Sequence, residues 1–186
     1  MWKKRSTWSN ILFLALLIAM VLPTSRMFIQ SNLLRLTLRA PSESSDSMQL
    51  IASDLNYAFR NQNGDIVKLG DLDDKPVLLN YWATWCAPCV AEMPSIQKLY
   101  DDYKDKVHFV LISNEESEKT LQFIEKKGYS FPLSTGIMGT PEKLSSSSIP
   151  ATFILSKKGK ILVSEIGANN WNHRKIRAIL DKDIRS

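Results

Sequence analysis

Residues 77–94 read V-L-L-N-Y-W-A-T-W-C-A-P-C-V-A-E-M-P, and this stretch decides the fold. Its first six residues form an apolar run that favours a strand buried on both faces of a sheet. A helix is expected to follow, over residues 86–104. The two cysteines of the chain, Cys86 and Cys89, therefore lie where a buried strand gives way to a helix.

This placement favours reactive cysteines. At the start of a helix, unpaired backbone N–H groups and the helix dipole stabilise a thiolate relative to a thiol. Cys86 is therefore expected to titrate below about 8.5 and to act as the attacking nucleophile. Cys89, one turn further along, is expected to resolve the mixed disulfide that Cys86 forms. A disulfide between these cysteines closes a short ring that can be both formed and reduced. The pair therefore indicates thiol–disulfide exchange rather than a permanent structural disulfide.

A zinc site and a pair of isolated buried thiols are the alternatives for these cysteines. Structural zinc needs about four ligands. The chain offers only His108 and His173 besides the cysteines, at a separation that fits no zinc-finger spacing. We therefore expect no metal and no cofactor at this site. Two thiols at this spacing on a helix start also favour a redox pair over isolated thiols.

The remainder of the globular part alternates short apolar runs with helical patterns. A β-hairpin with strands over 55–60 and 65–69 is expected around the turn residues 61–64. A helix is expected over 117–127, with Ser117 as its cap and Gly128 at its end. A short helix is expected to open at Thr140-Pro141. Further strands are expected over 107–113, 151–155 and 161–166, and a last helix over 172–183. The pattern predicts an α/β fold, a mixed sheet with helices on both faces.

The N-terminal part has a different composition. Residues 1–5 are basic, and residues 6–25 carry no charged side chain. A helix of this length rises about 30 Å, the hydrocarbon thickness of a bilayer. It is either a retained transmembrane anchor or a secretory signal that is removed, and the poor cleavage pattern favours retention.

Two further segments complete the expected domain organisation. Residues 26–48 are interpreted as a juxtamembrane segment followed by a serine-rich tether, because residues 40–48 are too polar to pack and should be flexible. The role of residues 26–39 stays open, since their apolar residues fit both a strand and a helix. The globular domain is expected to cover residues 49–186.

The charge distribution argues against a nucleic-acid partner. The net charge of the 186 residues is +5, but residues 1–40 hold six basic residues and no acidic one. Residues 41–186 therefore have a net charge of −1, and no phosphate-binding surface is implied.

The quoted stretch resembles the thioredoxin fold and, more narrowly, the membrane-anchored TlpA/ResA-type thiol-disulfide oxidoreductases. The resemblance extends from about residue 49 to the end, through W-C-A-P-C at 85–89, E-M-P at 92–94, K-K-G-Y-S-F-P-L at 126–133 and S-I-P-A-T-F-I-L at 148–155. It implies a three-layer α/β/α domain with a central mixed sheet and an N-terminal β-hairpin extension.

Residues around the cysteines take their expected roles from this resemblance. Trp85 and Ala87 match the rim of the active site, and Pro88 matches the loop residue that tunes exchange. Pro150, preceded by Ile149, matches the cis-proline that faces the disulfide. Such a proline leaves the neighbouring backbone free to pair with an extended substrate peptide.

Glu92 matches an acidic residue that this family keeps near its thiols. It lies three residues after Cys89, on the same side of the helix. If desolvated, its carboxylate would have a raised pKa and could exchange protons with Cys89. An ordinary solvated helix acid is the alternative. Asn80 stands where thioredoxins carry a buried aspartate, and an amide cannot take up a proton, so proton handling is expected to fall to Glu92.

The resemblance implies reduction of protein disulfides outside the cytoplasm, including those of apocytochromes c during cytochrome maturation. The expected partners are protein disulfide substrates, a membrane electron donor, and the bacterial cytoplasmic membrane, through the N-terminal helix. The domain would face the periplasm, or be secreted there after signal cleavage, as a monomer. Two alternatives stay open: an oxidase or isomerase running the exchange in the other direction, and a non-catalytic binding or metal-carrying module.

Overall fold

A computed structural model of the chain describes residues 3–21, 23–44, 48–137 and 139–186. The described residues form a seven-stranded sheet in the order β2-β1-β5-β4-β3-β6-β7. The strands are β1 (Ala58–Asn61), β2 (Ile66–Lys68), β3 (Val77–Tyr81), β4 (His108–Ile112), β5 (Leu133–Gly136), β6 (Ala151–Leu155) and β7 (Ile161–Ile166). The helices are α1 (Lys3–Val21), α2 (Pro23–Arg35), α3 (Ala52–Leu55), α4 (Ala87–Tyr103), α5 (Ser117–Lys127) and α6 (Arg174–Ile184), with 3₁₀ turns η1 (Leu69–Asp71) and η2 (Glu142–Leu144).

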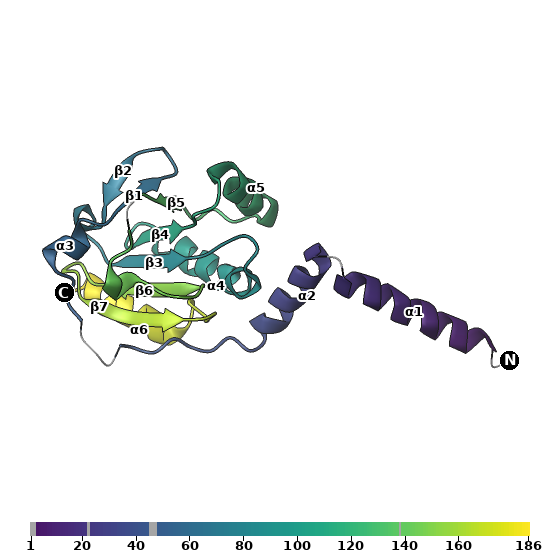
Figure 1. Ribbon diagram of the computed structural model, residues 1–186. Coiled ribbons are helices and arrows are strands. Elements are labelled where there is room, and N and C mark those ends of the chain that lie inside the picture. The colour runs from purple at the N-terminus through teal and green to yellow at the C-terminus, as the bar shows by residue number, and fades with distance from the viewer. Residues whose placement is uncertain (1–2, 22, 45–47, 138) are drawn as a thin grey trace.

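The sheet is mixed, as predicted. Strands β5, β4 and β3 are parallel neighbours, and the pairs on either side of them are antiparallel. The expected hairpin is β1 paired with β2. Figure 1 shows the sheet at the centre of the domain, with α1 projecting away from it.

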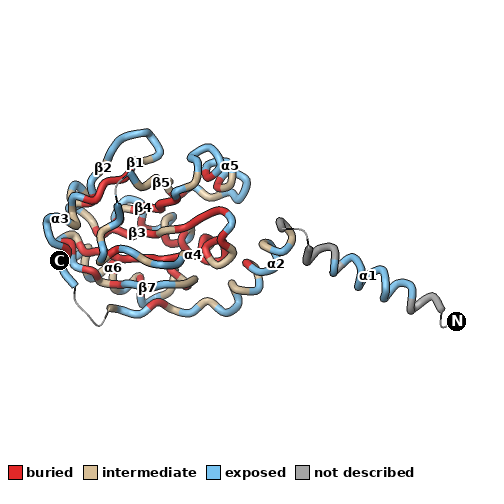
Figure 2. The backbone as a smooth tube through the Cα atoms, in the orientation of Figure 1, coloured by how far each residue is buried: buried red, intermediate tan, exposed pale blue. Residues whose placement is uncertain are grey.

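Strand β3 is buried on both faces of the sheet. Leu78 contributes to one apolar cluster, whereas Val77 and Leu79 contribute to the other. The helices α4, α5 and α6 all bury side chains in the first cluster. Short elements, α3, η1 and η2, cover the opposite face. Both faces of the sheet are therefore covered, and Figure 2 shows its central strands as buried. The helices α4, α5 and α6 pack on only one of these faces.

Several local predictions were wrong. Leu55 was expected in a strand but ends α3, so the hairpin begins only at Ala58. Strand β5 was not predicted at all. Glu116, not Ser117, occupies the cap position of α5 and makes no side-chain cap bond. The turn near Thr140 is the 3₁₀ turn η2, with Pro141 at its N-cap position and no side-chain cap bond. Gly128 does end α5 in the left-handed conformation, with φ of 71°.

The N-terminal part forms two helices instead of one span. Pro23 begins α2, and residue 22 lies outside the described residues. None of the helices in the described residues combines the length and the apolar character needed to cross a bilayer. Helix α2 packs against α4, and the Lys127 ammonium lies 5.9 Å from the centre of the Phe28 ring.

The segment predicted to be a flexible tether is hydrogen-bonded to the domain. The backbone N–H and the hydroxyl of Ser42 both donate to Oε1 of Glu165 at 2.8 Å, and the Ser44 N–H donates to the Leu162 carbonyl at 2.9 Å. Beyond residues 45–47, which are not described, the Met48 carbonyl accepts from the Ile161 N–H. The composition suggested flexibility because serines bury little apolar area, but these serines find partners along β7.

Candidate active site

The two cysteines lie at the start of α4 and form a disulfide. Cys86 is the N-cap residue, and its Cα is 5.2 Å from that of Cys89. The Cys89 N–H donates to Sγ of Cys86 at 3.2 Å. When the pair is reduced, this N–H and the helix dipole point at the Cys86 sulfur and stabilise its thiolate. Both side chains are buried in this oxidised form, with 5% and 1% exposure.

The surroundings of the disulfide agree with the sequence-based placement. Trp85 is 66% exposed, and Ala87 and Pro88 are half-buried at the first turn of α4. The Ile149–Pro150 peptide bond is cis, as expected. The Ile149 carbonyl oxygen lies 3.7 Å from Sγ of Cys86. The structure therefore brings the loop before β6 against the redox pair.

Glu92 is fully buried beneath this pair on α4. Its Oε2 accepts hydrogen bonds from Trp171 Nε1 at 2.9 Å and from the Asn169 backbone N–H at 3.1 Å. Its Oε1 accepts from Asn80 Nδ2 at 2.9 Å. Burial raises the pKa of Glu92 to about 7, although the three hydrogen bonds act to lower it. Glu92 is therefore a desolvated carboxyl and not a solvated helix acid, and it can take up or release a proton near neutral pH.

Asn80 joins Glu92 to the strand that follows the cis-proline. It is fully buried, and its Nδ2 also donates to Oγ1 of Thr152 at 2.7 Å. Its Oδ1 has no hydrogen-bond partner within the described residues. The sequence indicated Asn80 and Glu92, but it missed Thr152, Asn169 and Trp171. No local pattern marks those three residues, because only the fold brings them to the carboxylate.

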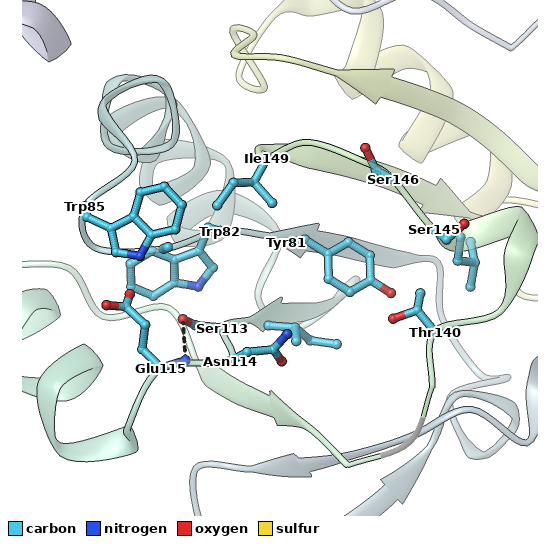
Figure 3. A pocket seen from close by; sticks show the side chains of 13 residues that line it. Tyr81, Trp82, Trp85, Ser113, Asn114, Glu115, Thr140, Ser145, Ser146 and Ile149 are labelled. Atoms are coloured by element: carbon cyan, nitrogen blue, oxygen red, sulfur yellow. Dashed lines mark hydrogen bonds between the residues drawn. The ribbon is translucent and has the colours of Figure 1, made fainter.

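A pocket of about 470 Å³ has Trp85 and Ile149, the neighbours of the redox pair, in its wall; Figure 3 shows its lining. It is lined by Tyr81, Trp82, Ala83, Trp85, Ile112, Ser113, Asn114, Glu115, Thr140, Leu144, Ser145, Ser146 and Ile149. Trp85 and Ile149 therefore border both the disulfide and this pocket. No sequence pattern predicts this pocket, because its walls come from three separate parts of the chain, residues 81–85, 112–115 and 140–149.

Glu115 is the charged residue in the lining, and its oxygens are occupied. Its carboxylate accepts from the Thr84 N–H at 2.6 Å, from the Thr84 hydroxyl at 2.9 Å and from the Lys119 ammonium at 2.5 Å. Burial acts to raise the pKa of Glu115, but the hydrogen bonds from Lys119 and Thr84 outweigh it and lower the pKa. Glu115 is thus a paired carboxylate near neutral pH.

The part of the chain that the structure describes contains no cluster of three or more His, Cys, Asp or Glu side chains arranged to hold a metal ion. The arrangement of the site combines three features. It has a sulfur pair at a helix start, a buried carboxyl on the same helix, and an open rim formed by Trp85 and Ile149.

Comparisons with known proteins agree with this geometry. Residues 49–164 match the AhpC/TSA family. The thioredoxin-like protein YneN of Bacillus subtilis is 33% identical over 132 residues, which cover 69% of this chain and 76% of YneN. The thiol-disulfide oxidoreductase ResA of Bacillus cereus is 34% identical over 128 residues, covering 66% of this chain and 72% of ResA.

Solved structures show the same fold. A thiol:disulfide interchange protein of the thioredoxin family from Chlorobium tepidum superposes with a TM-score of 0.57 at 20% identity, covering 76% of this chain and 99% of that protein. A DsbF homologue from Corynebacterium diphtheriae superposes with a TM-score of 0.54 at 22% identity, covering 77% of this chain and 98% of that protein.

Proposed function

Because this chain belongs to the AhpC/TSA family of thioredoxin-fold proteins and is a thiol–disulfide oxidoreductase, we propose that it reduces disulfides of client proteins outside the cytoplasm. The observation that carries the proposal is the position of Cys86. Its sulfur caps α4, accepts the Cys89 N–H and lies next to the Ile149 carbonyl. A client backbone paired with the loop at Ile149-Pro150 would bring its own disulfide to that sulfur.

The reaction begins from the reduced pair. The Cys86 thiolate attacks one sulfur of the client disulfide, the client S–S bond breaks, and the other client sulfur leaves as a thiolate that takes up a proton. Cys86 and the client are then joined by a mixed disulfide. The transfer of two electrons to the client is incomplete at this stage, because Cys89 is still a thiol and the client's second sulfur is still bonded to Cys86.

The second step releases the client. Glu92 lies on the same face of α4 as Cys89, three residues further along, and in its ionised form it can accept the Cys89 proton. The Cys89 thiolate attacks Sγ of Cys86, the client's second sulfur leaves, and the Cys86–Cys89 disulfide closes. The client has gained two electrons and two protons. A membrane dithiol donor then reduces the pair, and the cycle starts again.

The location and the client class are part of the same proposal. Helix α1 exposes Trp8, Ile11, Leu12, Phe13, Leu14 and Leu17. Exposed apolar side chains on a helix suit contact with lipid, which supports a membrane-tethered protein with its domain on the extracytoplasmic side. Apocytochromes c are the proposed clients, on the basis of the resemblance to the TlpA/ResA-type proteins.

The test is a trapping experiment with Cys89→Ser. This variant should accumulate the mixed disulfide between Cys86 and a client, visible on a non-reducing gel and lost on adding dithiothreitol. Cys86→Ser is the matched control and should trap nothing. Equal trapping by both variants would contradict the assigned roles.

The direction of electron flow needs a second measurement. A redox titration of the protein, followed by tryptophan fluorescence, should give a midpoint closer to the roughly −270 mV of a thioredoxin than to the roughly −120 mV of a strong oxidant. A midpoint near the latter value would assign the protein to disulfide formation.

A further inference from the structure

The pocket beside the redox pair lies where a client side chain would reach it. Its lining includes Trp85 and Ile149, which also border the disulfide, and it extends from them to η2 and the ends of β3 and β4 (Figure 3). A client bound along the loop before Pro150 presents its side chains alternately to opposite sides. One residue close to the client cysteine therefore faces into this pocket.

Two buried polar groups line the pocket, and the indole N–H of Trp82 has no partner. Trp82 is 3% exposed, and its Nε1–H makes no hydrogen bond within the described residues. The Tyr81 hydroxyl is also buried, and it faces the side chains of Thr140 and Tyr57, neither at full hydrogen-bonding geometry. Figure 3 shows the nitrogen edge of the Trp82 indole turned toward Tyr81.

Both groups are donors at the pH of the reaction. An indole N–H can only donate a hydrogen bond. Burial is the main cause that raises the pKa of Tyr81 above its usual range, so the hydroxyl keeps its proton. Because buried donors normally have partners, the unpartnered Trp82 N–H marks a position for a ligand atom that accepts hydrogen bonds, with the Tyr81 hydroxyl as a second donor on the same side of the pocket.

The charges around the pocket decide which acceptor fits. The described lining contains no lysine, arginine or histidine, so a client carboxylate would enter without a counter-ion and beside the Glu115 carboxylate. A client ammonium would leave the Trp82 N–H without an acceptor. The apolar side chains of Ile112, Leu144 and Ile149 surround the donors and suit the methylene groups of a neutral side chain.

From these observations, and resting on the proposed function, we infer that this pocket is a specificity subsite that selects a client carboxamide side chain, glutamine above all, next to the cysteine to be reduced. The carboxamide oxygen accepts from Trp82 or Tyr81. Its NH₂ group is free to donate to the hydroxyl-bearing side chains of Thr140, Ser145 and Ser146 at the other end of the lining.

The experiment measures reduction of matched peptides by the reduced full-length protein. Each peptide carries one disulfide, and the residue on each side of one cysteine is in turn Gln, Met, Glu or Lys. Methionine is the control for glutamine, because it has a similar length and no strong acceptor. Hydroxyethyl disulfide, which has no side chain to fill the pocket, reports exchange at Cys86 alone.

At one flanking position, kcat/KM for the Gln peptide should exceed that for the Met peptide by about tenfold, with Glu and Lys slower than Met. Tyr81→Phe, which removes one hydroxyl, should cut the Gln-to-Met ratio at least threefold. Tyr100→Phe removes a hydroxyl from α4 outside the pocket and should preserve the ratio.

Three results would overturn the inference. Met reduced as fast as Gln at both positions would show that the donors select nothing, and Glu or Lys reduced fastest would assign a charged client. An equal loss of rate on all peptides in Tyr81→Phe would give Tyr81 a structural role. Reduction of neither the peptides nor hydroxyethyl disulfide would instead refute the proposed function.

Discussion

Replacing Glu92 by glutamine should remove a pH dependence of stability that this carboxyl creates. Burial raises the pKa of Glu92 from 4.5 to about 7 in the folded protein. The folded state therefore binds the Glu92 proton more tightly than the unfolded state, and between these two pH values it holds more protons. Stability is then highest below pH 4.5 and falls as the pH rises through 7.

The size of the effect follows from the same shift. A change from 4.5 to about 7 corresponds to about 3 kcal/mol of unfolding free energy lost across that range. Glutamine has the shape of the protonated side chain and does not titrate. In Glu92→Gln this loss should disappear, leaving only the pH dependence contributed by other groups.

Urea unfolding of the oxidised protein, followed by tryptophan fluorescence between pH 4.5 and 8, measures this quantity. The oxidised form is used because its cysteines do not titrate. Glu125→Gln, at an exposed position of α5, is the matched control and should run parallel to the wild type. Parallel curves for Glu92→Gln and the wild type would refute the reasoning, because Glu92 would then titrate alike in both states.

Three further changes have defined outcomes. Asn80→Asp puts a second carboxyl within 2.9 Å of Glu92. Because two carboxylates this close share one proton, the loss of stability in the same urea series should move to higher pH. A stability curve at the same pH as the wild type would contradict this. Gly128→Ala places a residue with a Cβ atom in a backbone conformation with φ of 71°. It should lower the free energy of unfolding by about 1 kcal/mol, seen as a fall of roughly 2–4 °C in Tm. An unchanged Tm would show that the turn relaxes. Glu165→Gln weakens the acceptor of both Ser42 hydrogen bonds. Cleavage of the chain after Glu43 by a glutamate-specific protease should therefore become several-fold faster, with Glu118→Gln as the exposed control. Equal cleavage rates would mean that these hydrogen bonds do not hold the segment in place.

The sequence was sufficient where the signal is local. The apolar run over 77–82, followed at once by two cysteines three residues apart, predicted the strand, the helix and the redox pair together. The spacing of Glu92 from Cys89 placed its carboxyl on the same helix face. Each of these inferences needs only neighbouring residues and the geometry of one element.

It was insufficient where partners come from distant parts of the chain. Strand β5 has the composition L-S-T-G and is held by pairing with β1 and β4, so it carries no apolar pattern of its own. Trp171 reaches Glu92 from 79 residues further along the chain. Likewise, Ser42 is ordered by Glu165, 123 residues away, and composition alone suggests only flexibility there.

The docking of the N-terminal segment also determines how clients are met. The chain between α1 and the sheet is occupied by α2, which packs on α4, and by residues bonded along β7. With α1 in the lipid, as proposed, the described residues of this connection, 23–44 and 48–57, hold the domain close to α2 rather than on a free tether. Encounters would then depend on lateral diffusion of the whole protein, and every molecule would present its sulfur pair to a client at much the same height and angle above the bilayer surface.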